Sequence, residues 1–246
     1  MKTTAILSAL AQEQLGLMEQ LQQPVKVSHA GRDFWQGHLH GQPVVLALSK
    51  IGKVAAATTA AILIERFAAQ RIVFTGVAGG LGTGVSVGDV VVAHDFVQHD
   101  MDASPLFARY EVPLYGQSRF KSDAALADAL FDAAQSALAH TRLSSAYPNA
   151  QAHRGLVASG DRFVSGALES KALRAALLSA GHDALAVEME CAAVAQVCGD
   201  YRVPFAAIRT ISDRADDSAH IDFPSFIEQV AGRYAVAVMA QFLQRL

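Results

Sequence analysis

The chain has 246 residues, of which 52% are hydrophobic and 17% are charged, and its formal net charge is −3. That length suits a single α/β domain spanning residues 1–246, and the apolar composition indicates a sheet buried on both faces together with an apolar subunit interface. Lys and Arg are scattered rather than gathered into a basic stripe, and no segment approaches the roughly 18 uninterrupted apolar residues of a membrane span. Neither nucleic acid nor a membrane is therefore expected as a partner.

The N-terminus and the cysteines indicate the compartment. The segment from Thr3 to Ala11 is a short apolar run broken by Thr and Ser, so a first core strand is favoured over a signal peptide. Cys191 and Cys198 lie two turns apart on an expected helix, which is too far for an easy disulfide. Two buried free thiols in a reducing compartment are expected, which predicts a cytoplasmic protein.

Short apolar runs alternate along the chain with helical patterns, which is typical of a doubly wound or mixed α/β sheet. In chain order, the expected strands are Thr4–Ser8, Val44–Leu48, Ile72–Thr75, Asp89–Ala93, Gly155–Ala158, Ala184–Val187 and Phe205–Ile211. The expected helices are Ala11–Gln22, Lys53–Phe67, Ser122–His140, Glu169–Ser179, Glu190–Cys198 and Phe223–Leu243. Two stretches, Gln98–Lys121 and Ser144–His153, are expected as irregular connections, and the longer one is of a size that is usually functional or interfacial.

Several motifs that bind nucleotides or metals are missing. The glycine-rich stretch Gly76 to Gly84 contains no G-x-G-x-x-G and leads toward another strand, whereas the dinucleotide-binding fingerprint needs a helix there. Ile51-Gly52-Lys53-Val54 lacks the flanking residues of a P-loop, and no G-x-S-x-G nucleophile elbow occurs. The nine histidines are dispersed with no H-E-x-x-H. We expect neither a metal nor a cofactor.

Three acidic residues stand where folding does not require them. Glu13 follows the first strand, Glu190 lies at a strand-to-helix junction, and Asp213 ends the apolar run Phe205–Ile211. Because side chains beyond the carboxyl ends of strands converge on one crevice in an open α/β sheet, these three are candidates for proton transfer and cation stabilisation.

Each of these acids also has an ordinary interpretation. Glu13 could be a first-turn acid favoured by the helix dipole, and Asp213 could be a helix N-cap. Glu188 and Glu190 alternate with Met189, so one of the two could be solvated. Taken singly, none of these signals is specific.

The sequence segments around the three acids match those of a known family. The chain resembles the 5′-methylthioadenosine/S-adenosylhomocysteine nucleosidases, within the purine nucleoside phosphorylase-like fold, nearly end to end. The matching segments are Ile51-Gly52-Lys53-Val54-Ala55-Ala56, Thr75-Gly76-Val77-Ala78-Gly79-Gly80-Leu81, Val87-Gly88-Asp89-Val90, Ser159-Gly160-Asp161 with Phe163, Val187-Glu188-Met189-Glu190, and Ile211-Ser212-Asp213 with Ala215-Asp216. The resemblance implies a single-domain three-layer sandwich, with a central mixed twisted sheet flanked by helices.

The resemblance also implies an activity, which is hydrolysis of the N-glycosidic bond of the two named nucleosides. Glu13 matches the general base that deprotonates the attacking water, Asp213 the acid that protonates N7 of adenine, and Glu190 the carboxylate that holds the ribose hydroxyls. Met189 is expected beneath the sugar and Ser212 among the binding residues beside Asp213. The matching apolar contacts are Phe163 and the backbone of Val164 at the adenine edge, Ile51 and Phe223 near the 5′ substituent, and Phe107 supplied by the partner of a homodimer.

Val77 departs from the family pattern, because many relatives carry Ser or Thr there. Related phosphorylases hold phosphate with an Arg and a Ser in the stretch around Phe74 to Val77, and both matching positions are apolar in this chain. A dianion cannot be held without donors, so water is favoured as the nucleophile.

Two alternative functions are also compatible with the sequence. One is a hydrolase of the same fold that acts on futalosine or aminofutalosine, which differ at the 5′ group. The other is a non-catalytic nucleoside-binding or storage protein, which should have lost at least one of Glu13, Glu190 and Asp213; all three are present. Methionine salvage is one use of the main reaction.

Overall fold

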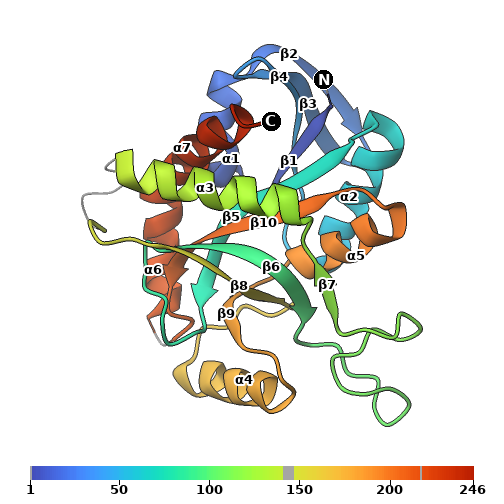
Figure 1. Cartoon of the computed structure of the whole chain (residues 1–246), viewed down its shortest axis with the longest axis vertical. Helices are drawn as coiled ribbons and strands as arrows, with labels where there is room; N and C mark the ends of the chain where they lie inside the picture. The colour runs from blue at the N-terminus through green and yellow to red at the C-terminus, as the bar shows by residue number, and fades with distance from the viewer. Residues whose placement is uncertain (1, 141–146, 217) are drawn as a thin grey trace.

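The computed structural model describes residues 2–140, 147–216 and 218–246. Within this part of the chain, ten strands form one sheet with helices on both sides (Figure 1). The strands are β1 Thr4–Ser8, β2 Gln22–His29, β3 Arg32–Leu39, β4 Gln42–Leu48, β5 Arg71–Gly80, β6 Val90–Gln98, β7 Arg119–Lys121, β8 Ala152–Ser159, β9 Ala184–Glu188 and β10 Phe205–Asp213. The helices are α1 Ala11–Gln20, α2 Lys53–Phe67, α3 Ala124–His140, α4 Ala167–Ser179, α5 Cys191–Tyr201, α6 Ala219–Phe226, the π-helical turn η1 Ile227–Ala231 and α7 Gly232–Leu243.

The helices cover the sheet in two layers. Helices α2 and α5 pack together over one face, and their small buried side chains, such as Ala56 and Ala192, lie against strand residues including Phe74. Helices α1, α3 and α7 cover the other face and enclose a second core around Ile6 and Val73. The sheet mixes parallel and antiparallel pairs. The predicted three-layer α/β sandwich with a mixed sheet is therefore confirmed.

Strand β5 organises the topology. Along one edge it pairs with β10 from Ile72 to Gly79. Along the other edge it pairs first with β1, as far as Phe74, and then with β9, at Gly79 and Gly80. Since β10 continues to β6, then β8 and β9, the five strands β5, β10, β6, β8 and β9 close on themselves, while β1, β4, β3 and β2 extend from β5 as an open sheet.

The hairpin of β2 and β3 was not predicted, and the first helix, expected to run to Gln22, ends at Gln20. Strand β2 is exposed on both faces, so it lacks the alternation that marks a half-buried strand. The turns are nevertheless characteristic: Ala30 and Gly31 both have positive φ, as do His40 and Gly41, and each pair forms a two-residue hairpin loop. Such loops are more often recognised by Asn-Gly, which explains the omission.

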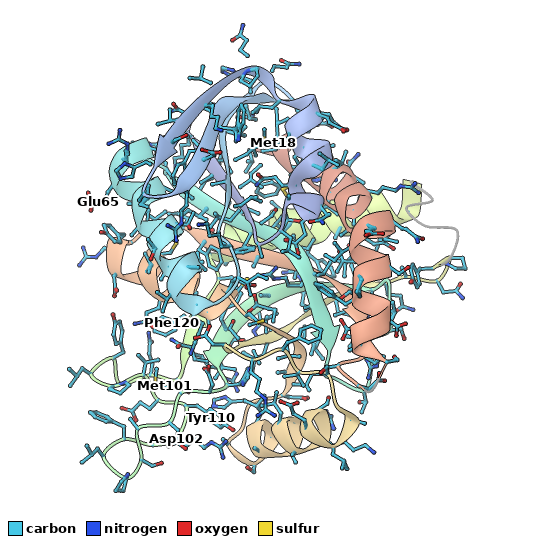
Figure 2. All side chains as sticks on the ribbon, turned by 180° about the vertical axis from the view of Figure 1, so that it is seen from behind. Met18, Glu65, Met101, Asp102, Tyr110 and Phe120 are labelled. Atoms are coloured by element: carbon cyan, nitrogen blue, oxygen red, sulfur yellow. The ribbon has the colours of Figure 1, made fainter. Side chains whose placement is uncertain are left out.

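The boundaries of several other elements differ from those expected from the sequence. Strand β7 lies inside the stretch expected to be a loop, and the remainder of that stretch is irregular. Met101, Asp102 and Tyr110 of this connection lie near α4, at the opposite end of the molecule from Met18 of α1 (Figure 2). The expected C-terminal helix from Phe223 instead starts at Ala219 and is interrupted by η1.

Helix α3 begins at Ala124, where the Asp123 carboxylate accepts the N–H of Leu126 as an N-cap does. Of the expected irregular connection Ser144–His153, residues 144–146 lie outside the described part, and Ala152 and His153 belong to β8. Both cysteines are free and buried, as predicted. Within the described ranges, no helix is long and apolar enough to cross a membrane.

Candidate active site

The candidate site lies where β5 separates from β1 and has not yet met β9. On that edge of β5, Thr75 to Ala78 have no strand partner. A cavity of about 310 Å³ occupies the gap, at the carboxyl ends of several parallel strands, where ligands bind in sheets of this kind. Its lining comprises Ala9, Leu10, Glu13, Ile51, Val77, Ala78, Gly79, Phe163, Val187, Glu188, Met189, Glu190, Arg209, Ser212, Asp213 and Phe223. The three carboxylates selected from the sequence thus share one cavity.

Glu13 crosses from the first turn of α1 to β5. Its Oε2 accepts the N–H groups of Ala9 at 2.8 Å and Leu10 at 2.9 Å, and so caps its own helix. Its Oε1 accepts the N–H of Val77 at 3.0 Å, which belongs to the stretch of β5 without a strand partner on that edge. Burial raises the pKa of this carboxyl, although Arg209 and the three N–H groups act in the opposite direction. Glu13 is a first-turn acid, but its side chain also reaches the cavity.

Glu188 and Glu190 are both buried, so the interpretation that one of them is solvated is wrong. The Glu188 carboxylate accepts the N–H groups of Glu190 and Cys191 at the start of α5, the Ser159 hydroxyl and the Arg209 guanidinium. Its acceptor sites are therefore occupied by the protein itself.

Glu190 is less fully bonded. Its Oε1 accepts the N–H of Gly52 at 3.0 Å, and its Oε2 lies 3.4 Å from Nη2 of Arg209. Burial, and next the charge of Glu188, raise the pKa of Glu190 to about 8. Of the two glutamates, Glu190 keeps more capacity to bond a ligand.

Arg209 is a site residue that the sequence analysis missed. It is 1% exposed, forms ion pairs with Glu188 and Glu190, and lies over the Phe74 ring at 4.3 Å from the centroid. A charged residue is rarely this buried unless it is paired. The signal that could have identified it was a single cationic residue within the mainly apolar run of β10. We interpreted that run only as a core strand.

Asp213 is the last residue of β10, and Ser218 is the N-cap of α6, so the N-cap interpretation of Asp213 is wrong. Its Oδ2 accepts the hydroxyl of Ser212 at 2.8 Å, and its Oδ1 accepts the N–H of Ala215 at 2.8 Å. Burial raises the pKa of the Asp213 carboxyl, against the effect of these two hydrogen bonds.

The rest of the lining is mostly apolar. Ile51 and Phe163 are 56% and 44% exposed, and the Phe163 ring meets the edge of Phe223 at 5.6 Å. Two predicted binding residues lie outside this lining: Val164, which is buried, and Phe107, which is half-buried in the connection before β7.

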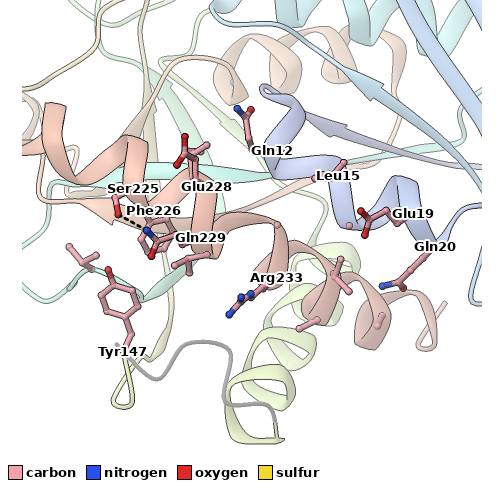
Figure 3. Close-up of a pocket in the computed structure, with 18 of the residues that line it drawn as sticks. Gln12, Leu15, Glu19, Gln20, Tyr147, Ser225, Phe226, Glu228, Gln229 and Arg233 are labelled. Atoms are coloured by element: carbon pink, nitrogen blue, oxygen red, sulfur yellow. Dashed lines mark hydrogen bonds between the residues drawn. The ribbon is translucent and has the colours of Figure 1, made fainter.

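A hollow larger than this cavity lies elsewhere on the described part of the chain. It is an open groove of about 1350 Å³ between α1, α6, η1 and α7 (Figure 3). Gln12 faces this groove, whereas the next residue, Glu13, lines the smaller cavity. None of the three candidate carboxylates lines the groove, so the concentration of buried acids identifies the candidate site better than size does.

The chemistry available in the cavity follows from its charges. Glu13 and Asp213 have raised pKa values, so each can exchange a proton near neutral pH more readily than an exposed carboxyl. Four carboxyl groups and a single guanidinium line the cavity, an arrangement that favours a developing cation in the substrate and disfavours a bound anion. Among the described residues, no group of three or more His, Cys, Asp or Glu side chains is arranged to hold a metal ion.

Comparison with known proteins agrees with this geometry. The family model of the phosphorylase superfamily matches residues 3–244. A 5′-methylthioadenosine/S-adenosylhomocysteine nucleosidase of Shewanella frigidimarina is 35% identical over 242 residues and 98% of both chains. The crystal structure of the nucleosidase of that name from Neisseria meningitidis, in complex with methylthio-immucillin-A, has a TM-score of 0.89 at 37% identity and 100% coverage of both chains. The futalosine hydrolase of Helicobacter pylori has a TM-score of 0.86 at 29% identity, covering 100% of this chain and 98% of that one.

The chain belongs to the phosphorylase superfamily, which is the class that the closed mixed sheet and its cavity indicate. Within that superfamily it is a member of the 5′-methylthioadenosine/S-adenosylhomocysteine nucleosidases. The resemblance identified from the sequence is confirmed.

Proposed function

We propose that this protein is a nucleosidase that hydrolyses the N-glycosidic bond of 5′-methylthioadenosine and S-adenosylhomocysteine, releasing adenine and the thioribose product. The observation that carries the proposal is the convergence of Glu13, Glu190 and Asp213 on one small, largely apolar cavity. Departure of adenine leaves an oxocarbenium-like sugar, and carboxylates in a dry site stabilise that charge.

Each carboxyl group is assigned one role. Glu13 orients the attacking water and takes its proton, since its Oε1 is held over the open stretch of β5. Asp213, whose raised pKa favours the protonated form, donates a proton to N7 so that adenine leaves as a neutral base. Glu190 holds the ribose hydroxyls, because its oxygens are the less committed ones.

The apolar contacts complete the assignment. Met189 packs beneath the sugar, Phe163 and the backbone of Val164 contact the adenine edge, and Ile51 and Phe223 enclose the 5′ substituent. Ser212 serves this site by bonding Asp213. Val77 contributes its N–H to Glu13 and a hydrocarbon side chain to the cavity.

Water is proposed as the nucleophile instead of phosphate. Arg209 is a donor that the sequence argument did not consider, but its Nη2 is bonded to Glu188 and lies beside Glu190. The charge of Glu13 also acts on this guanidinium. A phosphate dianion placed there would meet these carboxylates at short range in a low dielectric, which is strongly unfavourable.

An adenine-release assay on the purified protein, run with and without phosphate, tests the proposal. We expect release of free adenine at the same rate in both buffers, with the free thioribose as the second product. Dependence on phosphate, with a ribose 1-phosphate product, would refute hydrolysis. If no adenine were released in either buffer, the proposed nucleosidase activity would be refuted.

A second candidate substrate is aminofutalosine or futalosine, favoured by the structural likeness to the futalosine hydrolase of Helicobacter pylori. The two kinds of candidate substrate differ only at the 5′ group. Comparing kcat/KM for methylthioadenosine, adenosylhomocysteine and aminofutalosine separates them, and we expect the two thioether nucleosides to be preferred, because Ile51 and Phe223 form apolar walls.

We further propose a cytoplasmic homodimer in which each chain, a single nucleosidase domain over residues 1–246, supplies Phe107 to its partner's site. Large apolar side chains near the cavity mouth and on the connection that carries Phe107 support this arrangement. Val54, Leu106 and Leu114 are 78%, 85% and 92% exposed, and Ile51 at the mouth is 56% exposed. Covering such a surface favours association. Methionine salvage is the proposed use of the reaction.

A further inference from the structure

Three segments that are far apart in the sequence are tied together beside the cavity. They are residues 50–53 before and at the start of α2, residues 98–100 from the last residue of β6 onward, and residues 159–163 from the last residue of β8 onward. The first and third each place one side chain in the cavity, Ile51 and Phe163 respectively. The bonds between these segments therefore control the distance between two walls of the site.

Lys53 is the centre of these bonds. Its Nζ donates to Oδ1 of Asp100 and, at 3.1 Å, to Oε1 of Gln98, and its side chain is only 14% exposed. Its backbone N–H donates to Oδ1 of Asp161 at 2.7 Å. The circuit closes because the N–H of Asp161 donates to Oδ2 of Asp100 at 2.9 Å. Lys53, Asp100 and Asp161 thus form a closed latch of charge-assisted bonds between the three segments.

The latch reaches the site through Gly52. This residue has φ 96°, a conformation that favours glycine, and an added Cβ would lie 3.1 Å from Oδ1 of Asp161. The N–H of Gly52 donates to Oε1 of Glu190 at 3.0 Å. The Lys53 N–H lies in the Gly52–Lys53 peptide plane and the Gly52 N–H in the preceding plane, so only φ and ψ of Gly52 separate the two groups. Anchoring the Lys53 N–H on Asp161 therefore restricts the position of the N–H that holds Glu190.

We propose that Lys53, with Asp100 and Asp161, is a positioning residue that aligns Glu190 through Gly52 and fixes Ile51 opposite Phe163. None of the three latch residues is among the residues that line the cavity. The inference rests on the proposed function, because it assigns Glu190 to the ribose.

Variants of Lys53 test the latch with methylthioadenosine as substrate. Lys53→Met keeps the aliphatic stem and removes the charge, and we expect KM to rise about tenfold, equivalent to about 1.4 kcal/mol. We expect kcat to change by less than about threefold, because Glu13 and Asp213 stay in place. Lys53→Arg should recover most of the KM, since a guanidinium can still reach Asp100. Lys26→Met is the matched control, because Lys26 pairs with Asp33 on the distant hairpin, and its kinetics should equal the wild type.

A double-mutant cycle separates positioning from a general loss of stability. In a Glu190→Gln background, we expect Lys53→Met to weaken substrate binding by only about two- to threefold in calorimetry, because the contribution through Glu190 is lost and only the contribution through Ile51 remains. A full tenfold effect in that background would overturn the proposal, as would a fall in kcat with unchanged KM. If Lys53→Met does not fold, Asp100→Asn carries the same cycle. Adenine release by the wild type reports separately on the proposed function.

Discussion

In the proposed reaction, the Asp213 carboxyl must hold a proton in order to give it to the leaving base. It is 2% exposed, and burial raises its pKa against the two hydrogen bonds that favour the ionised form. As the proposed base, Glu13 must be ionised, although burial also raises its pKa. The three N–H groups that Glu13 accepts, and the neighbouring Arg209, favour ionisation of the base. The assignment of acid and base therefore follows from the number of donors around each carboxyl.

Asp213→Asn provides a test with a defined sign. Because the proposed role of Asp213 requires its protonated form, wild-type activity should fall as pH rises through its raised pKa, which gives the alkaline limb of the profile. The asparagine variant should lose that limb and lower kcat by about 10²–10⁴-fold, the usual value of a general acid. Profiles of kcat against pH, with KM measured in parallel, check this. A variant that keeps near-normal kcat would remove Asp213 from the reaction.

At the scale of the elements, the glycine-rich end of β5 serves close packing rather than phosphate binding. A Cβ added at Gly76 would overlap Arg209 and lie 2.8 Å from Oε1 of Glu13. A Cβ added at Gly84, in the same stretch of sequence, would meet nothing within 4 Å. The absence of the fingerprint was readable from the sequence, but the reason for the glycines was not, because it depends on side chains from α1 and β10.

The two glycines therefore give a matched pair of substitutions. We expect Gly76→Ala to lower kcat by about 10²-fold or more, because it displaces the base and the guanidinium together, of the same order as losing one general acid–base step. It should also lower stability by about 1–3 kcal/mol, which is typical of overpacking. Gly84→Ala should match the wild type in both respects. Steady-state kinetics and urea denaturation measure the two effects, and equal behaviour of the two variants would contradict this view of β5.

The elements also show where sequence reasoning succeeds. Buried strands such as β1 and β10 were recognisable as short apolar runs, and the acids at strand ends pointed to the cavity. Arg209 was overlooked because its partners, Glu188 and Glu190, come from another strand and helix. The β2–β3 hairpin was overlooked because its first strand has no buried face. Local pattern predicts an element only where burial repeats along the chain.

At the scale of the whole molecule, the closure of β5, β10, β6, β8 and β9 brings the ends of β1, β9 and β10 to one point. This closure of the sheet could not be predicted from any local sequence pattern, because β9 pairs with β5 at only Gly79 and Gly80. The cavity that results is open on the side where Ile51 and Phe163 are exposed. A single chain thus leaves the cavity partly open to water on the side of these two residues, which the proposed second chain would cover.

The proposed homodimer can be tested on this basis. Light scattering should give twice the 26.0 kDa mass of the chain. Val54→Asp should yield the monomer with a raised KM for methylthioadenosine, because a charge placed at an apolar interface cannot be paired there. Phe107→Ala should keep the dimer mass and raise KM alone, since it removes only the aromatic supplied to the neighbour. If adding Phe107→Ala to the monomeric Val54→Asp variant raised KM further, Phe107 would serve its own chain and the shared site would be wrong.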